Sequence, residues 1–188
     1  MSIKKVFQQF PQIETKNLIL RKINPADSRA IFDILSDIKV TEYYDDDAFT
    51  DIAQAIDQIE AWENGYKNSF CIRWGIIQKY DWAIIGSCGY YGIHAWNLRA
   101  SFGYELASEY WRQGIMTEAL RAMISFGFDE MGLNRIDAVV MPGNNASIRM
   151  LERLGFHNEG RLEAYEKWGS KGFVDLFMFA MLRKVWRS

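Results

Sequence analysis

Cysteine and histidine are scarce in this chain, with two residues of each among 188. Cys71 and Cys88 lie in apolar, strand-like stretches, and His94 and His157 are far apart. None of the four has a second cysteine or histidine near it at metal-ligand spacing. A lone cysteine in such a stretch behaves as a small buried hydrophobe. We therefore expect two buried, reduced thiols and no metal site.

A long hydrophobic run is also missing. Residues 1–9 contain two lysines but no apolar run of signal-peptide length. A spanning helix would need about 18 or more consecutive apolar residues, and no such span occurs. The sequence predicts a cytoplasmic protein that does not associate with a membrane.

Charge of one sign is not in excess, because the formal net charge is -2. Proteins that bind the nucleic-acid backbone need a basic field, so the balance of charge argues against nucleic acid as the main partner. An amine or another basic partner is compatible with this charge.

Apolar and aromatic residues are abundant: 49% of the chain is hydrophobic and 15% is aromatic, with seven Trp. A chain of this length and composition fits one domain with a full core. We expect a single domain over residues 1–188, with residues 1–12 as an N-terminal extension. The aromatic content also favours a homodimer, whose contact surface the sequence does not define.

Hydrophobic periodicity predicts an α/β (α+β) fold around one mixed sheet. Strand patterns cover residues 13–23, 70–78, 83–93, 101–106, 135–141, 156–166 and 173–182. Helical patterns cover residues 25–35, 51–67, 115–131 and 145–154. A polar turn at residues 79–81 joins two of the strands, and the last two strands form a hairpin.

The segment around Gly114 has the chemistry of an anion site. Trp111, Arg112 and Gln113 precede it, and an amphipathic helix pattern follows. A helix N-terminus leaves about four N–H groups unpaired, and a glycine there removes the Cβ that would obstruct a phosphate. The strand at residues 101–106 comes just before, so the unit is strand, basic turn and helix. This context favours phosphate binding.

Several motifs in order resemble the GNAT acetyltransferase superfamily. They are the strand–RQG–helix unit, then Asn144-Asn145-Ala146-Ser147, then Leu151-Glu152-Arg153-Leu154-Gly155-Phe156. The resemblance covers the chain from residue 13 to the end. Thr15, Leu18, Leu20-Arg21 and Thr117-Glu118-Ala119 resemble the ribosomal-protein N-terminal acetyltransferase-like branch.

The resemblance implies a GNAT-like fold, with a mostly antiparallel sheet of about seven strands, a splayed central pair and about four flanking helices. It also implies acetyl-CoA as cosubstrate. The residues it assigns to coenzyme binding are Leu106, Arg112, Gln113, Gly114, Ile115, Met116, Thr117, Asn144 and Ser147. Met116 stands where the family usually has a small residue. Its N–H remains available to a phosphate if its side chain turns into the core.

Two catalytic roles are predicted, a general base and a proton donor. Glu105 lies near the end of the strand at residues 101–106, on a face shared with small residues, and the resemblance implies that the acceptor amine meets the thioester there. Glu105 is therefore the candidate general base, and Glu163 is the second candidate. By resemblance, Ser147 protonates the leaving thiolate. The structural alternatives are a solvated glutamate at a strand end, and a serine and an asparagine that cap a helix.

The acceptor side is predicted from Tyr43 and Tyr44, which precede three aspartates, and from Glu163 and Tyr165. The alternative for the residues 43–47 is a solvated turn before a helix. The resemblance implies an N-acetyltransferase that acts on a primary amine, most simply the N-terminal α-amine of a protein. The alternatives are acetylation of a small amine such as a polyamine or aminoglycoside, a non-catalytic acyl-CoA-binding regulatory domain, and a nucleotide-binding domain.

Overall fold

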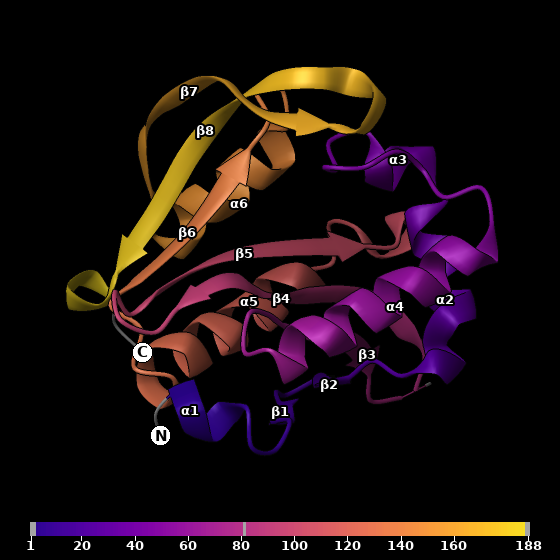
Figure 1. Ribbon diagram of the computed structural model, residues 1–188, viewed down its shortest axis with the longest axis horizontal. Helices are drawn as coiled ribbons and strands as arrows, with labels where there is room; N and C mark the ends of the chain where they lie inside the picture. The colour runs from indigo at the N-terminus through magenta and orange to yellow at the C-terminus, as the bar shows by residue number, and fades with distance from the viewer. Residues whose placement is uncertain (1–2, 81, 187–188) are drawn as a thin grey trace.

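The computed structural model describes residues 3–80 and 82–186, and its eight strands form one sheet in the order β1-β2-β3-β4-β5-β6-β8-β7 (Figure 1). β5 and β6 run parallel, and every other neighbouring pair is antiparallel. The strands are β1 (Ile13–Glu14), β2 (Leu18–Lys22), β3 (Ile72–Gln78), β4 (Ile84–His94), β5 (Arg99–Leu106), β6 (Arg135–Val140), β7 (His157–Trp168) and β8 (Gly172–Leu182). The predicted mixed, mostly antiparallel sheet is confirmed.

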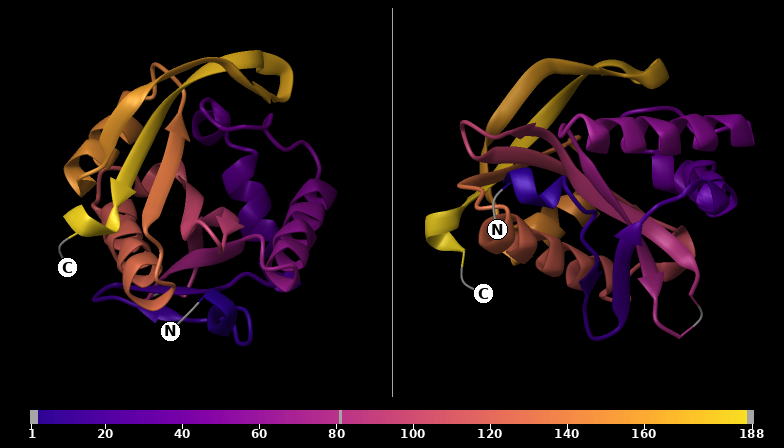
Figure 2. Two further views of the ribbon diagram at one scale, coloured as in Figure 1. Left: turned by 60° about the vertical axis from the view of Figure 1, so that its left-hand side comes forward. Right: turned by 60° about the horizontal axis from the view of Figure 1, so that its bottom comes forward.

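Helices cover both faces of the sheet (Figure 2). The longer ones are α2 (Ser28–Leu35), α4 (Ile52–Lys67), α5 (Ile115–Ser125) and α6 (Asn145–Leu154), and α1 (Ile3–Val6) and α3 (Ile38–Thr41) are single turns. α2 and α4 enclose a small core around Ile31, Leu35 and Ile59 on one face. α5 packs against the other face, where Leu120 and Met123 join the main core. The expectation of about four flanking helices agrees with this arrangement.

The first predicted strand, residues 13–23, is divided into β1 and β2 by a turn. A carboxylate from α5 holds this turn. Glu118 accepts hydrogen bonds from the Thr15 hydroxyl (2.6 Å) and from the backbone (2.9 Å) and side-chain (2.8 Å) nitrogens of Asn17. The partner lies 101 residues or more away in the sequence, so local periodicity does not reveal the division. The sheet therefore has eight strands rather than about seven.

The segment before β1 packs on the body of the protein. Ile3 and Val6 of α1 are buried. The Tyr66 hydroxyl donates to the Val6 carbonyl (2.8 Å), and the Trp74 indole donates to the Pro11 carbonyl (2.8 Å). Met1 of the predicted extension and Asp81 of the predicted turn lie outside the described residues. No helix in the described ranges is long and apolar enough to cross a membrane.

Both cysteines are free and buried, as predicted, with Cys71 8% and Cys88 0% exposed. α5 continues into a π-helical segment, Phe126–Glu130, and the chain turns at Gly132, where φ is 74°. Gly155 ends α6 with φ of 96°. Both glycines stand at the helix ends that the sequence predicts, because a left-handed residue after a helix favours glycine.

The parallel strands β5 and β6 pair for only three residues. Their register runs from Arg99 opposite Arg135 to Ser101 opposite Asp137, where the Ser101 hydroxyl donates to the Asp137 carboxylate (2.6 Å). Beyond this point β6 remains paired with β8, so the sheet opens between β5 and β6 (Figure 1). The predicted splayed central pair is confirmed.

Candidate active site

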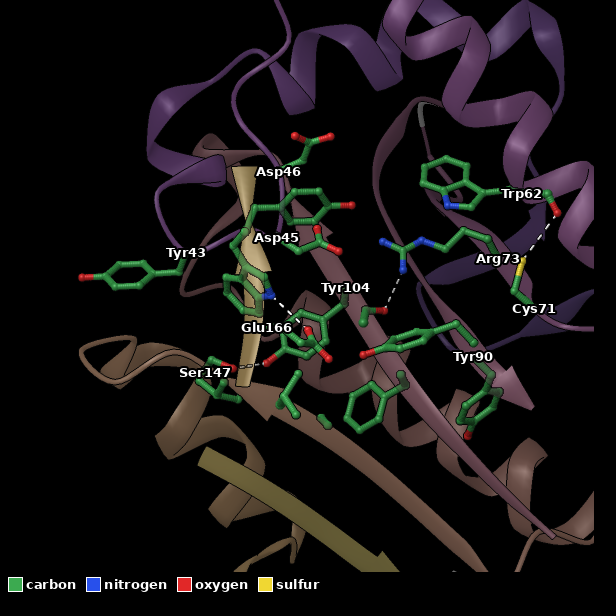
Figure 3. Close-up of a pocket in the computed structure, with 18 of the residues that line it drawn as sticks. Tyr43, Asp45, Asp46, Trp62, Cys71, Arg73, Tyr90, Tyr104, Ser147 and Glu166 are labelled. Atoms are coloured by element: carbon green, nitrogen blue, oxygen red, sulfur yellow. Dashed lines mark hydrogen bonds between the residues drawn. The ribbon is translucent and has the colours of Figure 1, made fainter. Parts of the chain in front are cut away.

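A cavity of about 480 Å³ lies at the opening between β5 and β6 (Figure 3). Its wall includes Tyr104 of β5, residues 138–141 at the end of β6, and Asn144 and Ser147 at the start of α6. It also includes residues 43–46, the side of α4 around Trp62, and Glu166 of β7. The cavity is thus built from segments spread over more than half of the chain.

One strand edge at the opening has no strand partner. The Ala107 N–H donates to Ile85 of β4 (2.8 Å), whereas the Leu98 carbonyl accepts from Asn134 on the β6 side (2.6 Å). Backbone groups alternate in direction along a strand, so even-numbered residues of β5 direct theirs toward β6. In the described part of the chain no strand pairs with this edge beyond Ser101. The edge at Phe102 and Tyr104 is therefore available to an extended amide ligand.

The predicted anion loop begins just after this edge. Gly114 is the N-terminal cap of α5 with φ of 81°, and a Cβ built there would meet nothing within 4 Å. The Trp111 indole donates to the Leu106 carbonyl (2.8 Å), and the Gln113 amide donates to the Glu109 carbonyl (2.9 Å). The first bond connects the loop to the end of β5, and the second connects Gln113 to Glu109 near the start of the loop.

The first turn of α5 presents backbone N–H groups beside the exposed Arg112 and Gln113. The N–H groups of Ile115, Met116 and Thr117 precede the first intrahelical bond, which the Glu118 N–H makes to Gly114. Met116 is buried, 8% exposed, so its side chain turns into the core and leaves its N–H free of steric cover. The terminus has the positive partial charge that suits a phosphate.

Ser147 and Tyr104 meet across the opening. The two hydroxyl oxygens lie 2.5 Å apart, and the Asn144 side chain accepts from the Ser147 N–H (3.1 Å). Asn144 is therefore the N-cap of α6, which is the structural alternative that the sequence left open, and it also lines the cavity. Burial raises the pKa of Tyr104 to about 12. Near neutral pH its hydroxyl keeps its proton.

Glu105 does not line the cavity but contacts Arg73, which does. Its carboxylate pairs with Arg73 and accepts from the Ser87 hydroxyl, and its side chain is 2% exposed. Arg73 itself lines the cavity, donates to Ser87 (2.7 Å) and to the Gly103 carbonyl (3.0 Å), and has its guanidinium carbon 5.2 Å from the centre of the Trp62 ring. Burial raises the pKa of Glu105, and the Arg73 charge opposes this shift.

Three other carboxyl groups line the cavity, on Asp45, Asp46 and Glu166. Burial raises the pKa of Asp45. The Trp168 indole donates to one Glu166 carboxylate oxygen (3.0 Å), and Figure 3 shows Glu166 and Tyr104 among the residues that line the cavity. These carboxyl groups give this part of the cavity wall an acidic character.

The predicted acceptor residues are not all brought together. Tyr43 and Tyr44 line the cavity, whereas Glu163 and Tyr165 are exposed and are not among its lining residues. Sequence reasoning missed Glu166, Arg73 and Trp62. The only signal for Glu166 was its place three residues after Glu163, and the register of β7 against β8 fixes its position opposite Val174.

A clasp, formed by Asp47 on one side and Ser170 and Lys171 on the other, joins two segments whose neighbouring residues line the cavity. The Ser170 hydroxyl (2.7 Å) and N–H (3.0 Å) donate to Asp47, and Lys171 donates to the Tyr44 carbonyl (3.2 Å). Gly169 has φ of 44°, and a Cβ there would come within 3.0 Å of the Asp47 backbone. The clasp thus joins the tip of the β7–β8 hairpin to residues 41–47.

No group of three or more histidine, cysteine, aspartate or glutamate side chains that could hold a metal occurs in residues 3–80 and 82–186. The polar atoms that face the cavity are hydroxyl, carboxyl, guanidinium and amide groups. The structure thus combines a sheet that opens between β5 and β6, a helix N-terminus after the end of β5, and a cavity lined by carboxyl groups.

Comparison with known proteins gives the family. The model of the acetyltransferase (GNAT) domain matches residues 17–157. The uncharacterized N-acetyltransferase YoaA of Bacillus subtilis is 40% identical over 156 residues, 83% of this chain and 88% of that protein. The [ribosomal protein uS5]-alanine N-acetyltransferase of Escherichia coli is 30% identical over 101 residues, 53% of this chain and 52% of that protein.

Solved structures agree on the fold. The structure of Mycobacterium smegmatis RimJ in complex with CoA-disulfide superposes with a TM-score of 0.79 at 22% identity, covering 91% of this chain and 85% of that chain. The chain belongs to the GNAT family and is an acetyl-CoA-dependent N-acetyltransferase.

Proposed function

We propose that this enzyme acetylates the N-terminal α-amine of a protein or peptide by direct attack of the amine on the thioester. The observation that carries the proposal is the single cavity that joins the Tyr104–Ser147 pair to the carboxylates of Glu166, Asp45 and Asp46. An acidic wall attracts a cationic amine, and a nearby carboxylate can take its proton. The name of the Escherichia coli relative, [ribosomal protein uS5]-alanine N-acetyltransferase, is compatible with a protein acceptor.

The proposed site for acetyl-CoA is the loop before α5 together with the neighbouring edge of β5. The N–H groups of Ile115, Met116 and Thr117, with Arg112 beside them, suit the pyrophosphate. The free edge of β5 at Tyr104 suits the amides of pantetheine, since such an edge pairs with extended chains. These residues position the thioester at the opening, where the reaction with the amine takes place.

Glu166 is the proposed general base, acting directly or through a water. The sequence predicts Glu105 as the general base, and this remains a prediction. The Glu105 carboxylate is bonded to Arg73 and Ser87, however, and Glu105 is not among the residues that line the cavity. Glu166 accepts a hydrogen bond from Trp168 and lines the cavity. A base must come within hydrogen-bond reach of the proton that it removes, which favours Glu166.

The pKa of the acceptor decides how strong a base is needed. An α-amine with a pKa of about 8 costs about 1.4 kcal/mol to deprotonate at pH 7, whereas a lysine amine with a pKa of about 10.4 costs about 4.6 kcal/mol. One carboxylate without a catalytic dyad suits the first task better. Ser147, bonded to Tyr104, is the proposed proton donor to the departing thiolate.

The acceptor class is tested by measuring thiol release from acetyl-CoA with four substrates: a peptide with a free N-terminus, the same peptide acetylated at its N-terminus, an N-acetylated peptide with an internal lysine, and a polyamine. We expect turnover with the first alone, and mass spectrometry should place the acetyl group on the α-amine. Turnover with the polyamine alone would make the enzyme a small-amine acetyltransferase. Coenzyme binding without turnover on any amine would favour a regulatory domain.

The roles of the residues are tested by matched variants. Glu166→Gln should lower kcat by about 100-fold, a typical contribution of a general base, with the Kd for acetyl-CoA unchanged. Glu105→Gln should lower kcat much less, and the reverse order would establish Glu105 as the base.

Ser147→Ala should slow the reaction only about 3- to 10-fold, because a coenzyme A thiolate leaves readily near neutral pH. Full kcat in Ser147→Ala would remove the acid role.

A further inference from the structure

β7 is irregular next to the cavity. Leu162 pairs with Leu176 and Glu166 pairs with Val174, so the three residues 163–165 of β7 stand opposite the single residue Asp175 of β8. A regular antiparallel ladder would place one residue there. β7 therefore carries a bulge of two extra residues, which we call the β7 bulge.

The β7 bulge decides where Glu166 stands. In a regular ladder that continued from Leu162 and Leu176, Ala164 would lie opposite Val174, and Glu166 would lie opposite Gly172 at the end of β8. Two residues of a strand span about 7 Å. The β7 bulge thus moves Glu166 about this far back from the hairpin tip, to the position where its carboxylate faces the cavity (Figure 3).

Asp175 holds the β7 bulge from the opposite strand. One of its carboxylate oxygens accepts from the Ala164 N–H (2.7 Å), and the other accepts from Arg161, with the Nε donor at 3.0 Å. Ala164 has φ of 45°, a left-handed conformation that is strained for a residue other than glycine. The hydrogen bond to the Ala164 N–H compensates for the ladder bond that the bulge interrupts.

We infer that Asp175 is a positioning residue for the reaction, because it holds the bulge that places Glu166 at the cavity. The inference rests on the proposed role of Glu166. Bulges beside active sites commonly redirect a side chain, and a displacement of even about 1 Å can slow catalysis considerably. Asp175 itself touches neither the cavity wall nor, in this mechanism, the reacting atoms.

The test is a double-mutant cycle measured at saturating acetyl-CoA. Asp175→Ala should lower kcat at least about tenfold, with the Kd for acetyl-CoA within about twofold of the wild type. In a Glu166→Gln background the same substitution should have almost no further effect, because Asp175 acts only through Glu166. A residue that merely stabilised the fold would lower kcat by the same factor in both backgrounds, and that result would overturn the inference.

Three controls separate the contacts of Asp175. Asp175→Asn keeps an oxygen for the Ala164 N–H and should recover most of kcat. Arg161→Ala removes only the ion pair and should resemble the wild type. Ala164→Gly relieves the left-handed conformation and should leave kcat unchanged. A large loss of kcat in both Arg161→Ala and Asp175→Asn would assign the effect to the charge of Asp175 rather than to the β7 bulge. That result would contradict the inference.

A deletion keeps the test decisive if Asp175→Ala does not fold. Removing Ala164 and Tyr165 makes β7 regular and leaves Glu166 opposite Val174, so this deletion combined with Asp175→Ala should recover kcat. Failure to recover it in a folded protein would overturn the inference. The proposed role of Glu166 can fail separately from the role of Asp175. If Glu166→Gln alone retains full kcat, Glu166 is not the base. If Glu166→Gln has a low kcat and Asp175→Ala has a normal kcat, only the role of Asp175 is removed.

Discussion

The regions proposed to bind the coenzyme and the acceptor are built in different ways. The proposed coenzyme side consists of consecutive chain, from the end of β5 through Gly114 to the first turn of α5, and it offers backbone N–H groups. The proposed acceptor side is the cavity, which brings together Tyr44, Trp62, Arg73 and Glu166 from separate segments and offers side chains. A backbone site tolerates a change of side chain such as Met116, whereas a side-chain site depends on each contact.

This difference matches what each side has to bind. The coenzyme does not change from one acetyltransferase to another, so a local backbone motif is sufficient for it. The acceptor is where such enzymes differ, and side chains on several elements can be altered independently. We therefore expect substitutions on the acceptor side to have the larger structural consequences, and a backbone substitution on the coenzyme side to act on affinity alone.

The largest effect is expected for Arg73→Met, which leaves Glu105 buried without its charged partner. Breaking a buried ion pair by removing one partner costs about 3–5 kcal/mol, and these side chains are 10% and 2% exposed. Denaturant unfolding should show a loss of this size. The control is Lys22→Met, which removes a pair to Glu63 with side chains 42% and 31% exposed and should cost no more than about 1 kcal/mol. Equal losses would contradict the comparison.

An intermediate effect is expected on the coenzyme side for Gly114→Val. A valine at φ of 81° is strained, and the loop must change shape to relieve it. The Kd for acetyl-CoA should rise at least about tenfold, equivalent to about 1.4 kcal/mol, as measured by calorimetry. Gly92→Val is the matched control, since Gly92 also has a positive φ of 57° and open space around it but lies away from the loop. An unchanged Kd in Gly114→Val would remove this loop as the phosphate site.

The smallest effect is expected at the clasp, and it should depend on pH. Hydrogen bonds from Ser170 hold the pKa of Asp47 below its usual range. A carboxyl group of this kind stabilises the folded state above its unfolded pKa of about 3.9, and the contribution is lost as the pH falls through the lower folded value. Asp47→Ala should lower Tm by about 1–3 °C at pH 7 and by less toward pH 3.

Thermal melts between pH 7 and pH 3 check this expectation. Asp57→Ala, at an exposed position of α4, is the control and should follow the wild type throughout. A difference between Asp47→Ala and the wild type that grew on acidification would contradict the sign of the effect.

Much of the fold could be predicted because its signals are local. The capping box of Asp51 and Gln54 starts α4, and Gly155 ends α6, where the pattern predicts. The division of the first strand could not be predicted, because Glu118 holds the turn from more than a hundred residues away. Periodicity reports which side chains alternate, and it carries no information about a partner so distant.

For the site, the sequence by itself determined the strand, Gly114 and the helix start as one unit, and the Asn144–Ser147 segment as another. Both depend on backbone conformation within a few residues, which the local sequence specifies. Only the tertiary structure decided that Glu105 pairs with Arg73, that Trp62 lies against the Arg73 guanidinium, and that the β7 bulge brings Glu166 rather than Ala164 opposite Val174 at the cavity. These outcomes depend on strand register and on burial against distant segments, and a linear pattern of residue types specifies neither.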